Sequence, residues 1–229
     1  DKYRYTGPQS TKHSMETAQA ASISKPIEML ARPRTLVNVI DVESTCWKPF
    51  PKDQISDIIE IGITVLDYES LEILSTESII IKPKHSTISE FCTQLTTITP
   101  EFVEENGISF AEAASILEAR YDPKNSLFAS YGNYDRKMFQ KQFELHGLPY
   151  AFGDKHLNIK ALFAGAHALR REVGMDSALR IAGIPLHGTH HRGGDDSRNI
   201  AALLAHVVAG QHANPQFRAA LDQFAAHLP

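Results

Sequence analysis

The chain has 229 residues, a formal net charge of −4, 42% hydrophobic residues and 22% charged residues. These values predict one well-packed globular domain and exclude a disordered chain. The negative charge also excludes a protein that coats nucleic acid over a long footprint, because such binding draws on many Lys and Arg contacts with phosphates. A nucleic-acid partner must therefore be held locally.

The cysteines and the lengths of the apolar stretches indicate the cellular compartment of the protein. Cys46 and Cys92 are the only two cysteines and have no paired spacing, so we expect reduced thiols and a cytoplasmic protein. No apolar stretch reaches about 18 residues and no secretory signal pattern opens the sequence, so we expect no membrane partner. Residues 1–33 are polar and hold Met15, a candidate native start, so we assign them to an N-terminal extension that is in part an added leader.

The fold prediction begins with a buried strand. Residues 36–43 read Leu-Val-Asn-Val-Ile-Asp-Val-Glu, an apolar run rich in β-branched residues that suits the centre of a sheet. Residues 57–66 and 71–81 predict two further strands around a polar turn. We therefore expect an antiparallel meander of three strands.

Helices and parallel strands are expected to follow. Two helices lie around Phe102 and over 110–121, and a short strand at 127–129 precedes a helix over 135–145. The remaining elements are a strand at 156–160 and helices at 161–171, 175–182 and 195–208. This order predicts an α/β domain with a mixed five-stranded sheet, three antiparallel strands plus parallel strands, flanked by helices.

The domain is expected to span residues 34–210. Beyond it, apolar residues recur at helical spacing: Phe217, Leu221, Phe224 and Leu228. Residues 211–229 are therefore expected to form a C-terminal helix that packs on the domain.

Asp41 and Glu43 are two apart on the first predicted strand, so both side chains leave the same face while Val42 points the other way. One interpretation is a pair of acids at a strand end in water. The other is a metal site, because two like charges at the end of a buried strand repel each other and lose solvation, and a hard divalent cation relieves both effects. The flanking apolar run favours the metal site.

Asp195 and Asp196 begin the last long predicted helix. Counting back four residues from Ile200 reaches Asp196, which places this acid on the core-facing stripe. Asp195 is rotated by about 100° and is expected to cap the helix. Position favours Asp196 as the functional acid, although two ordinary first-turn acids that complement the helix dipole would give the same sequence.

Asp135 and His191 are weaker candidates by themselves. Asp135 opens a helix after a short strand, where Asp is among the preferred N-caps. His191 lies in a loop rich in Gly and His, five residues before Asp196, and a loop histidine is commonly an ordinary surface residue. His190 is its immediate rival, and only the spacing to Asp196 separates the two.

Taken in order, these residues resemble the DEDDh exonucleases, the DnaQ-like branch of the ribonuclease H-like fold. The resemblance runs from about Leu36 to Val208. Four segments are similar to the Eri-type exoribonucleases, which trim histone-message stem-loops, ribosomal RNA and small RNAs. They are Asp41-Val-Glu-Ser-Thr-Cys46, Phe91-Cys-Thr-Gln-Leu-Thr, Ser130-Tyr-Gly-Asn-Tyr-Asp135 and His191-Arg-Gly-Gly-Asp-Asp-Ser-Arg-Asn-Ile-Ala201.

The resemblance implies a 3′→5′ exonuclease that releases nucleoside 5′-monophosphates from the 3′ end of RNA or single-stranded DNA, with RNA favoured. Asp41, Glu43 and Asp196 would ligate one Mg²⁺ or Mn²⁺, Asp41 would share a second ion, and Asp135 would support that ion directly or through water. Two such ions stabilise the attacking and leaving oxygens at phosphorus. His191 would be the general base that deprotonates the attacking water.

The resemblance also indicates how the terminal nucleotide is held. Tyr134 and Phe91 match base-stacking positions, and stacking holds a base without reading sequence. Phe91 fits a core position equally well. Thr45 and the backbone around Ser44 are expected near the terminal sugar and its 3′ hydroxyl. Two departures from the family, Thr97 in place of Gly and Tyr134 in place of Trp, bear on substrate preference, and Glu60 is similar to a family glutamate to which we assign no role.

Two other functions fit the same residues. A catalytically inactive module that binds 3′ ends would keep the fold, but its usual signature is the loss of a metal acid or of the histidine, and all five residues are present. A metal-dependent phosphodiesterase acting on small nucleotides would need the same acid cluster. A nuclease acting on polymers is the function that the four segments favour.

Overall fold

The computed structural model describes residues 35–210, which fold around one mixed sheet with the strand order β3-β2-β1-β4-β5. The strands β1, β2 and β3 pair antiparallel, whereas β4 joins β1 in parallel and β5 joins β4 in parallel. Their bounds are β1 Leu36–Ser44, β2 Ile58–Asp67, β3 Ile73–Ile80, β4 Leu127–Ser130 and β5 His156–Asn158. The predicted five-stranded sheet of antiparallel and parallel strands is confirmed.

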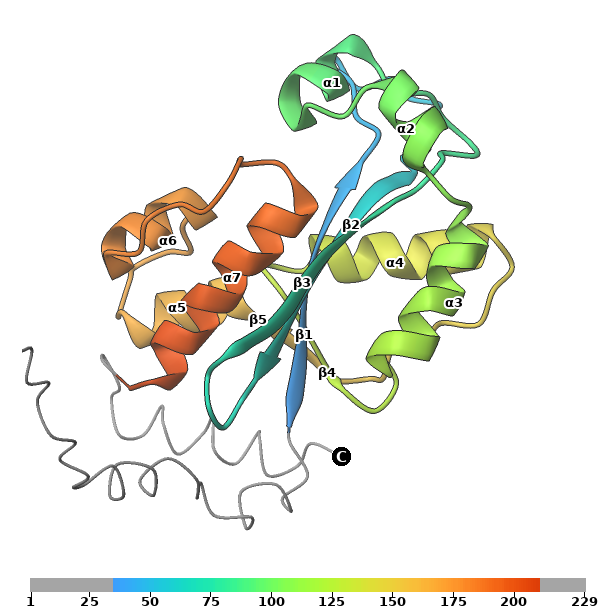
Figure 1. Ribbon diagram of the computed structural model, residues 1–229. Coiled ribbons are helices and arrows are strands. Elements are labelled where there is room, and N and C mark those ends of the chain that lie inside the picture. The colour runs from blue at the N-terminus through green and yellow to red at the C-terminus, as the bar shows by residue number, and fades with distance from the viewer. Residues whose placement is uncertain (1–34, 211–229) are drawn as a thin grey trace, which may run out of the picture. The chain divides into compact units, whose positions relative to one another are not determined.

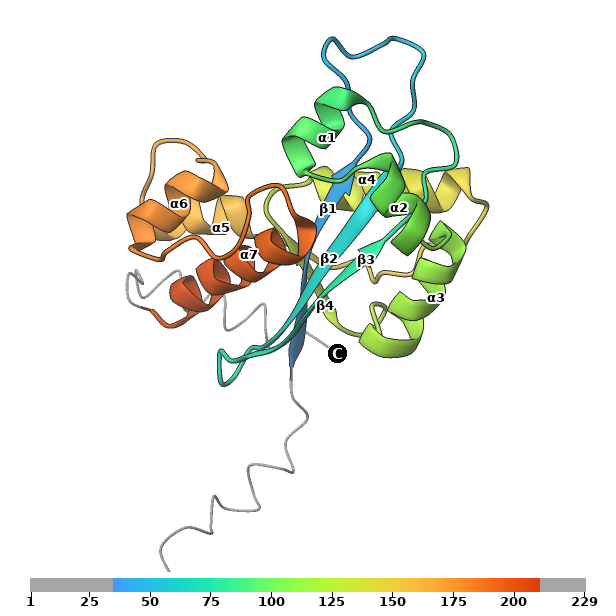
Figure 2. The same ribbon diagram turned by 45° about the horizontal axis from the view of Figure 1, so that its top comes forward.

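Helices cover both faces of the sheet. Figures 1 and 2 show α5, α6 and α7 on one side, α3 and α4 on the other, and α1 and α2 beyond the end of β1; Figure 2 turns this end towards the viewer. Their bounds are α1 Glu90–Thr96, α2 Pro100–Asn106, α3 Phe110–Tyr121, α4 Tyr134–Leu145, α5 Ile159–Ala166, α6 Met175–Ala182 and α7 Gly193–Val208.

Side-chain alternation along β1 divides the core into two halves. Val37 and Val39 pack with residues of α5, α6 and α7, whereas Ile40 packs with residues of α3 and α4. Successive side chains of a strand point to opposite faces. Asp41 and Glu43 therefore continue the row of Val37 and Val39 on the face that α7 covers.

The strand β2 is buried along its whole length, including Glu60 and Gly62. A buried charge requires hydrogen-bonded partners, and a glycine inside a strand often marks the close approach of another backbone. Both residues face the start of α7, which is described with the site below.

Several predicted elements differ from the structure. The sequence predicts two helices between β3 and β4, and the structure has three, because α1 is a seven-residue helix whose N-cap Ser89 accepts the Cys92 N–H. The predicted strand at 156–160 ends at Asn158, whose side chain caps α5. The helix expected at 161–171 ends at Ala166.

The predicted extension over 1–33 and the predicted C-terminal helix over 211–229 lie outside the described residues. Within the described part of the chain, no helix combines the length and the apolar character that crossing a membrane requires. Both cysteines are free thiols.

Candidate active site

Three carboxylates converge where the end of β1 meets the start of α7. Asp41 and Glu43 leave β1 on the face that α7 covers, and Asp196 lies in the first turn of α7. One carboxylate oxygen of each residue lies within 4.8 Å of the other two. The phase of the helix predicts that Asp196 faces the core, and its exposed fraction of 4% agrees.

The start of α7 is held by Glu60, whose side chain is fully buried in β2. Its Oε2 accepts the Gly193 backbone N–H at 2.9 Å and the Arg192 Nε–H at 3.2 Å, and its Oε1 accepts the Ser78 hydroxyl at 2.6 Å. The first N–H groups of a helix lack partners within the helix and form the positive end of its dipole. Glu60 therefore fixes the first turn of α7 and, with it, Asp196.

Two glycines bring the backbone of α7 against the sheet. A Cβ atom on Gly62 would lie 1.8 Å from the Gly193 carbonyl carbon, and a Cβ atom on Gly193 would lie 3.1 Å from the Asp41 carbonyl oxygen. A larger residue at Gly62 therefore fits only if the helix moves. This backbone contact sets the separation between the acids of β1 and Asp196.

The fourth acid, Asp135, approaches from α4. This helix begins at Tyr134 with Asn133 as its N-cap, so the interpretation of Asp135 as an N-cap is wrong. The Asp135 Oδ1 instead accepts the Val42 N–H at 3.0 Å, and the residue is 4% exposed. After burial, the charge of Asp135 is the next cause of the raised pKa of Asp41.

The acid cluster holds more negative than positive charge, although Arg192 lowers the pKa of Glu43. Part of Asp41 stays exposed, but burial of its carboxyl group raises its pKa well above the usual range, and the charges of Asp135, Glu43 and Asp196 add to the rise. Burial raises the pKa of Glu43 to about 8 and that of Asp135 to about 6. Such a cluster takes up protons or cations, and a divalent ion that prefers oxygen ligands matches this donor set.

The loop before α7 brings both histidines to Asp196. The Asp196 Oδ2 accepts the His191 backbone N–H at 2.9 Å and lies 3.0 Å from the His190 Nδ1. The two imidazole rings stack with their centroids 4.0 Å apart. The spacing argument selects His191, whereas the structure gives the side-chain contact with Asp196 to His190 and the backbone contact to His191.

His191 has a φ of 64°, a left-handed conformation that is uncommon for residues other than glycine. Burial, followed by the charge of His190, lowers the pKa of the His191 ring, while Asp196 acts in the opposite direction. The ring is therefore neutral at neutral pH, which is the form that accepts a proton.

The predicted capping role of Asp195 is wrong. The helix α7 begins two residues earlier, at Gly193, and its N-cap is Arg192. The Asp195 Oδ2 instead accepts the Thr189 backbone N–H at 2.8 Å. Asp195 thereby ties the histidine loop to the first turn of α7 and stays outside the acid cluster.

Tyr134 and Phe91, the two predicted stacking residues, both reach the surface. Tyr134 is 54% exposed, and its hydroxyl lies 2.5 Å from the Ser44 Oγ, next to Glu43 in the chain. Phe91 lines a groove of about 470 Å³ together with Trp47. Each aromatic ring therefore has an accessible surface.

Thr45 is buried, unlike the two aromatic residues. Its Oγ1 accepts the Asp57 backbone N–H at 2.9 Å and lies 2.8 Å from the Ser86 Oγ. Its backbone N–H donates to the Asp57 carbonyl at 2.9 Å, so both the hydroxyl and the backbone serve the fold, and the approach of Thr45 to a terminal sugar stays a prediction.

Sequence reasoning missed Arg192 and the contact of the Ser44 hydroxyl with Tyr134, and it gave no role to Glu60. The available signal was the position of Glu60, a charge inside an apolar strand, since a buried carboxylate requires partners. The partners themselves are far away in the sequence and carry no local pattern.

Together, the sheet and the acid cluster define a ribonuclease H-like nuclease fold, and comparisons with known proteins agree. The family described as RNase_T, Exonuclease, matches residues 38–204. The 3'-5' exoribonuclease 1 of Rattus norvegicus is 28% identical over 179 residues, 74% of this chain and 52% of the rat protein. The probable 3'-5' exonuclease KapD of Bacillus subtilis is 27% identical over 169 residues, 72% of this chain and 81% of that protein.

A solved structure agrees with these relatives. The nuclease domain of 3'hExo, a DEDDh family member, bound to rAMP, superposes with a TM-score of 0.67 and 25% identity over 78% of this chain and 94% of that one. The chain belongs to this exonuclease family, and its domain is a DEDDh 3′→5′ exonuclease domain close to the Eri type. It spans about half the length of the rat relative.

Proposed function

We propose that the domain hydrolyses phosphodiester bonds from the 3′ end of RNA and releases nucleoside 5′-monophosphates. The observation that carries the proposal is the convergence of Asp41, Glu43 and Asp196, with ligand oxygens within 4.8 Å of one another, beside a loop with two histidines. The relatives named as 3'-5' exoribonucleases support RNA as the substrate.

The chemistry of the donors fits two Mg²⁺ or Mn²⁺ ions. Asp41, Glu43 and Asp196 would hold one ion, Asp41 would be shared with the second, and Asp135 would support the second ion. When bound, two such ions stabilise the attacking and leaving oxygens of an in-line displacement at phosphorus. The raised pKa values of Asp41 and Glu43 support this assignment, because each marks a carboxylate that is buried among other carboxylates.

The chain's own contribution to the reaction is to hold the acids and to move a proton. We assign the general base to His191, whose neutral ring takes the proton of the attacking water at a ring nitrogen. His190 contacts the Asp196 carboxylate and is assigned to orient that acid. Glu60 and the Gly62–Gly193 contact keep Asp196 at a fixed distance from β1.

The terminal nucleotide would be held by exposed rings at the end of β1. Tyr134 lies beside the acid site. It precedes Asp135 in the chain, and the Tyr134 hydroxyl forms a hydrogen bond with the Ser44 hydroxyl. Phe91 offers a second ring in the groove beside Trp47. Stacking on such rings does not depend on the base, which suits an enzyme that meets any 3′ end.

The test is a time course on 5′-labelled single-stranded RNA, single-stranded DNA and an RNA stem-loop, each with Mg²⁺, Mn²⁺ or EDTA. We expect a ladder that shortens one nucleotide at a time on RNA, dependence on the ion, and inhibition by a 3′-phosphate. Early internal fragments would identify an endonuclease.

The same experiment addresses the two other functions. A catalytically inactive 3′-end-binding module would bind the RNA and leave it intact under every condition. A phosphodiesterase for small nucleotides would hydrolyse bis-nitrophenyl phosphate faster than it shortens the oligonucleotide. We expect the oligonucleotide to be preferred.

A further inference from the structure

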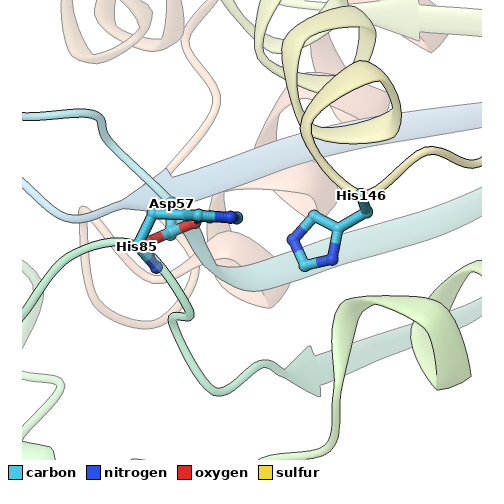
Figure 3. Close-up of side chains that lie close together, drawn as sticks. All are labelled: Asp57, His85 and His146. Atoms are coloured by element: carbon cyan, nitrogen blue, oxygen red, sulfur yellow. Dashed lines mark hydrogen bonds and ion pairs between the residues drawn. The ribbon is translucent and has the colours of Figure 1, made fainter.

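A second group of chemically active side chains lies away from the acid cluster. It consists of Asp57, just before β2, His85, in the loop after β3, and His146, at the C-cap of α4. Figure 3 shows the His146 ring directed towards Asp57 and His85. One ligand atom of each residue lies within 4.8 Å of the other two. His146 packs on Phe110 of α3, so this group lies on the face of the sheet opposite α7.

The Asp57 carboxylate is fixed by three hydrogen bonds, and its side chain is 2% exposed. Its Oδ1 lies 2.8 Å from the His85 Nδ1, and its Oδ2 accepts the His85 backbone N–H and the Ser86 hydroxyl, each at 2.7 Å. Metal-binding sites commonly hold a carboxylate in this way through surrounding donors. Asp57 is therefore oriented without any contribution from His146.

The His146 ring is placed by aromatic packing. It lies tilted on Phe110, with ring centroids 4.9 Å apart, and edge-on to His85, with centroids 5.2 Å apart. Within residues 35–210 the ring has no hydrogen-bond partner of its own. The ring nitrogens are therefore not committed to a partner within the described residues.

We propose that Asp57, His85 and His146 form a binding site for a transition-metal dication, Zn²⁺, with a fourth position open to water. Two imidazoles and a carboxylate are ligands that Zn²⁺ prefers, whereas Mg²⁺ prefers oxygen alone. Ligand atoms around tetrahedral Zn²⁺ lie about 3.3 Å apart, given Zn–N distances of about 2.0–2.1 Å. The His85 Nδ1 and Asp57 Oδ1, at 2.8 Å, are already near this separation, and the ligand atoms of all three residues lie within 4.8 Å of one another.

The position of the site indicates a structural role. It joins the entry to β2, the loop after β3 and the end of α4, three segments that are distant in the sequence. Ser86 extends the network from Asp57 to Thr45, which follows β1 directly. The opposite end of α4 carries Asp135. Bound Zn²⁺ would therefore stabilise the elements that present the acid site, without contacting the substrate.

The experiment uses the full chain carrying Asp41→Asn and Asp196→Asn, which weakens ion binding at the acid cluster and at the neighbouring group of His190, His191 and Asp196. Calorimetric titration of the metal-free protein should give one Zn²⁺ per chain. The His85→Gln variant and the His146→Phe variant, which keeps a ring against Phe110, should each bind at least about tenfold more weakly. Zn²⁺ at about 100 times its Kd should raise Tm by about 5–10 °C, an effect that both variants lose and Mg²⁺ does not reproduce.

The matched control is His187→Gln, because His187 is an exposed histidine outside the group and its loss should leave Zn²⁺ binding unchanged. Equal Zn²⁺ affinity with and without His85 and His146 would overturn the proposal and leave Asp57 and His85 as a hydrogen-bonded pair. Should both variants fail to fold, Co²⁺ is added to the protein that keeps both histidines. Tetrahedral coordination of Co²⁺ gives strong visible absorption, and a protein without this absorption would contradict the proposed site.

Discussion

Residues 35–210 contain two groups that each join one buried aspartate to two histidines. In the first, Asp196 meets His190 and His191, and in the second, Asp57 meets His85 and His146. The residue types are the same, but the surroundings of the aspartate differ. Asp196 faces further carboxylates, whereas Asp57 accepts hydrogen bonds from N–H and O–H groups.

This difference decides which ion each group suits. Around Asp196, burial and then the charges of neighbouring carboxylates raise the pKa of Glu43 to about 8, and the site offers mainly oxygen. Around Asp57 the donors already compensate one carboxylate oxygen, and ring nitrogens supply two of the three ligands. Hard Mg²⁺ or Mn²⁺ matches the first set and Zn²⁺ matches the second. The shared composition of one aspartate and two histidines would not separate the two groups.

The largest expected effect comes from the acids of the first group. Asp41→Asn or Asp196→Asn should abolish nuclease activity, because each removes a ligand oxygen charge from the cluster. Neither should lower Tm in the metal-free protein, since each removes repulsion between carboxylates. Hydrolysis of 5′-labelled RNA and thermal unfolding measure the two effects. Asp195→Asn is the matched control and should be much milder, because Asp195 bonds Thr189 outside the cluster.

The next largest effect on turnover is expected from the two histidines of that group. His191→Ala should reduce turnover by about 10²–10⁴, the usual contribution of a general base, and leave metal affinity nearly unchanged. His190→Ala should change turnover much less. Single-turnover rates and Mn²⁺ titrations separate the two variants. The reverse order of effects would make His190, which lies 3.0 Å from Asp196, the base.

A smaller effect on stability and activity is expected from the backbone contact between Gly62 and Gly193, which keeps Asp196 close to β1. Gly62→Ala places a Cβ atom 1.8 Å from the Gly193 carbonyl carbon, so α7 must shift. We expect a loss of about 1–3 kcal/mol in the free energy of unfolding, together with lower activity as Asp196 moves away from β1. Gly174→Ala is the control, because a Cβ atom there has no neighbour within 4 Å. Urea unfolding of both variants measures the difference, and equal stabilities would contradict the packing argument.

The sequence predicts the fold well where patterns are local. The apolar runs of β1 and β2 are visible in the chain, and the bounds predicted for α6, Met175–Ala182, match the structure. The helix α1 was not predicted, because it has only seven residues and buries only Cys92 and Thr96, which is too short an apolar pattern to indicate a helix. Its N-cap Ser89 was the one local signal.

The site residues were predictable where the spacing of residues in the sequence determines the direction of their side chains. The two-residue spacing of Asp41 and Glu43 and the phase of α7 both depend on neighbouring residues alone. The role of Glu60 depends on Gly193, which is 133 residues away, and no local pattern reports that contact. The start of α7 follows from the same contact, which is why Asp195 was misplaced as a cap.

The smallest expected effect is a pH dependence that belongs to the first group. Burial raises the pKa of Glu43 from 4.5 to about 8, so between these values the metal-free folded protein holds a proton that the unfolded chain has released. Stability must then fall as pH rises through this window. Glu43→Gln should reduce the fall without removing it, because Asp41 and Asp135 also have raised pKa values. Urea unfolding midpoints at pH 5 and pH 8 in EDTA measure the fall in stability for the unsubstituted protein and for Glu43→Gln. An equal fall in both proteins would contradict the role of Glu43. Added Mg²⁺ should flatten the slope of the unsubstituted protein, because the ion displaces the protons from the same oxygens.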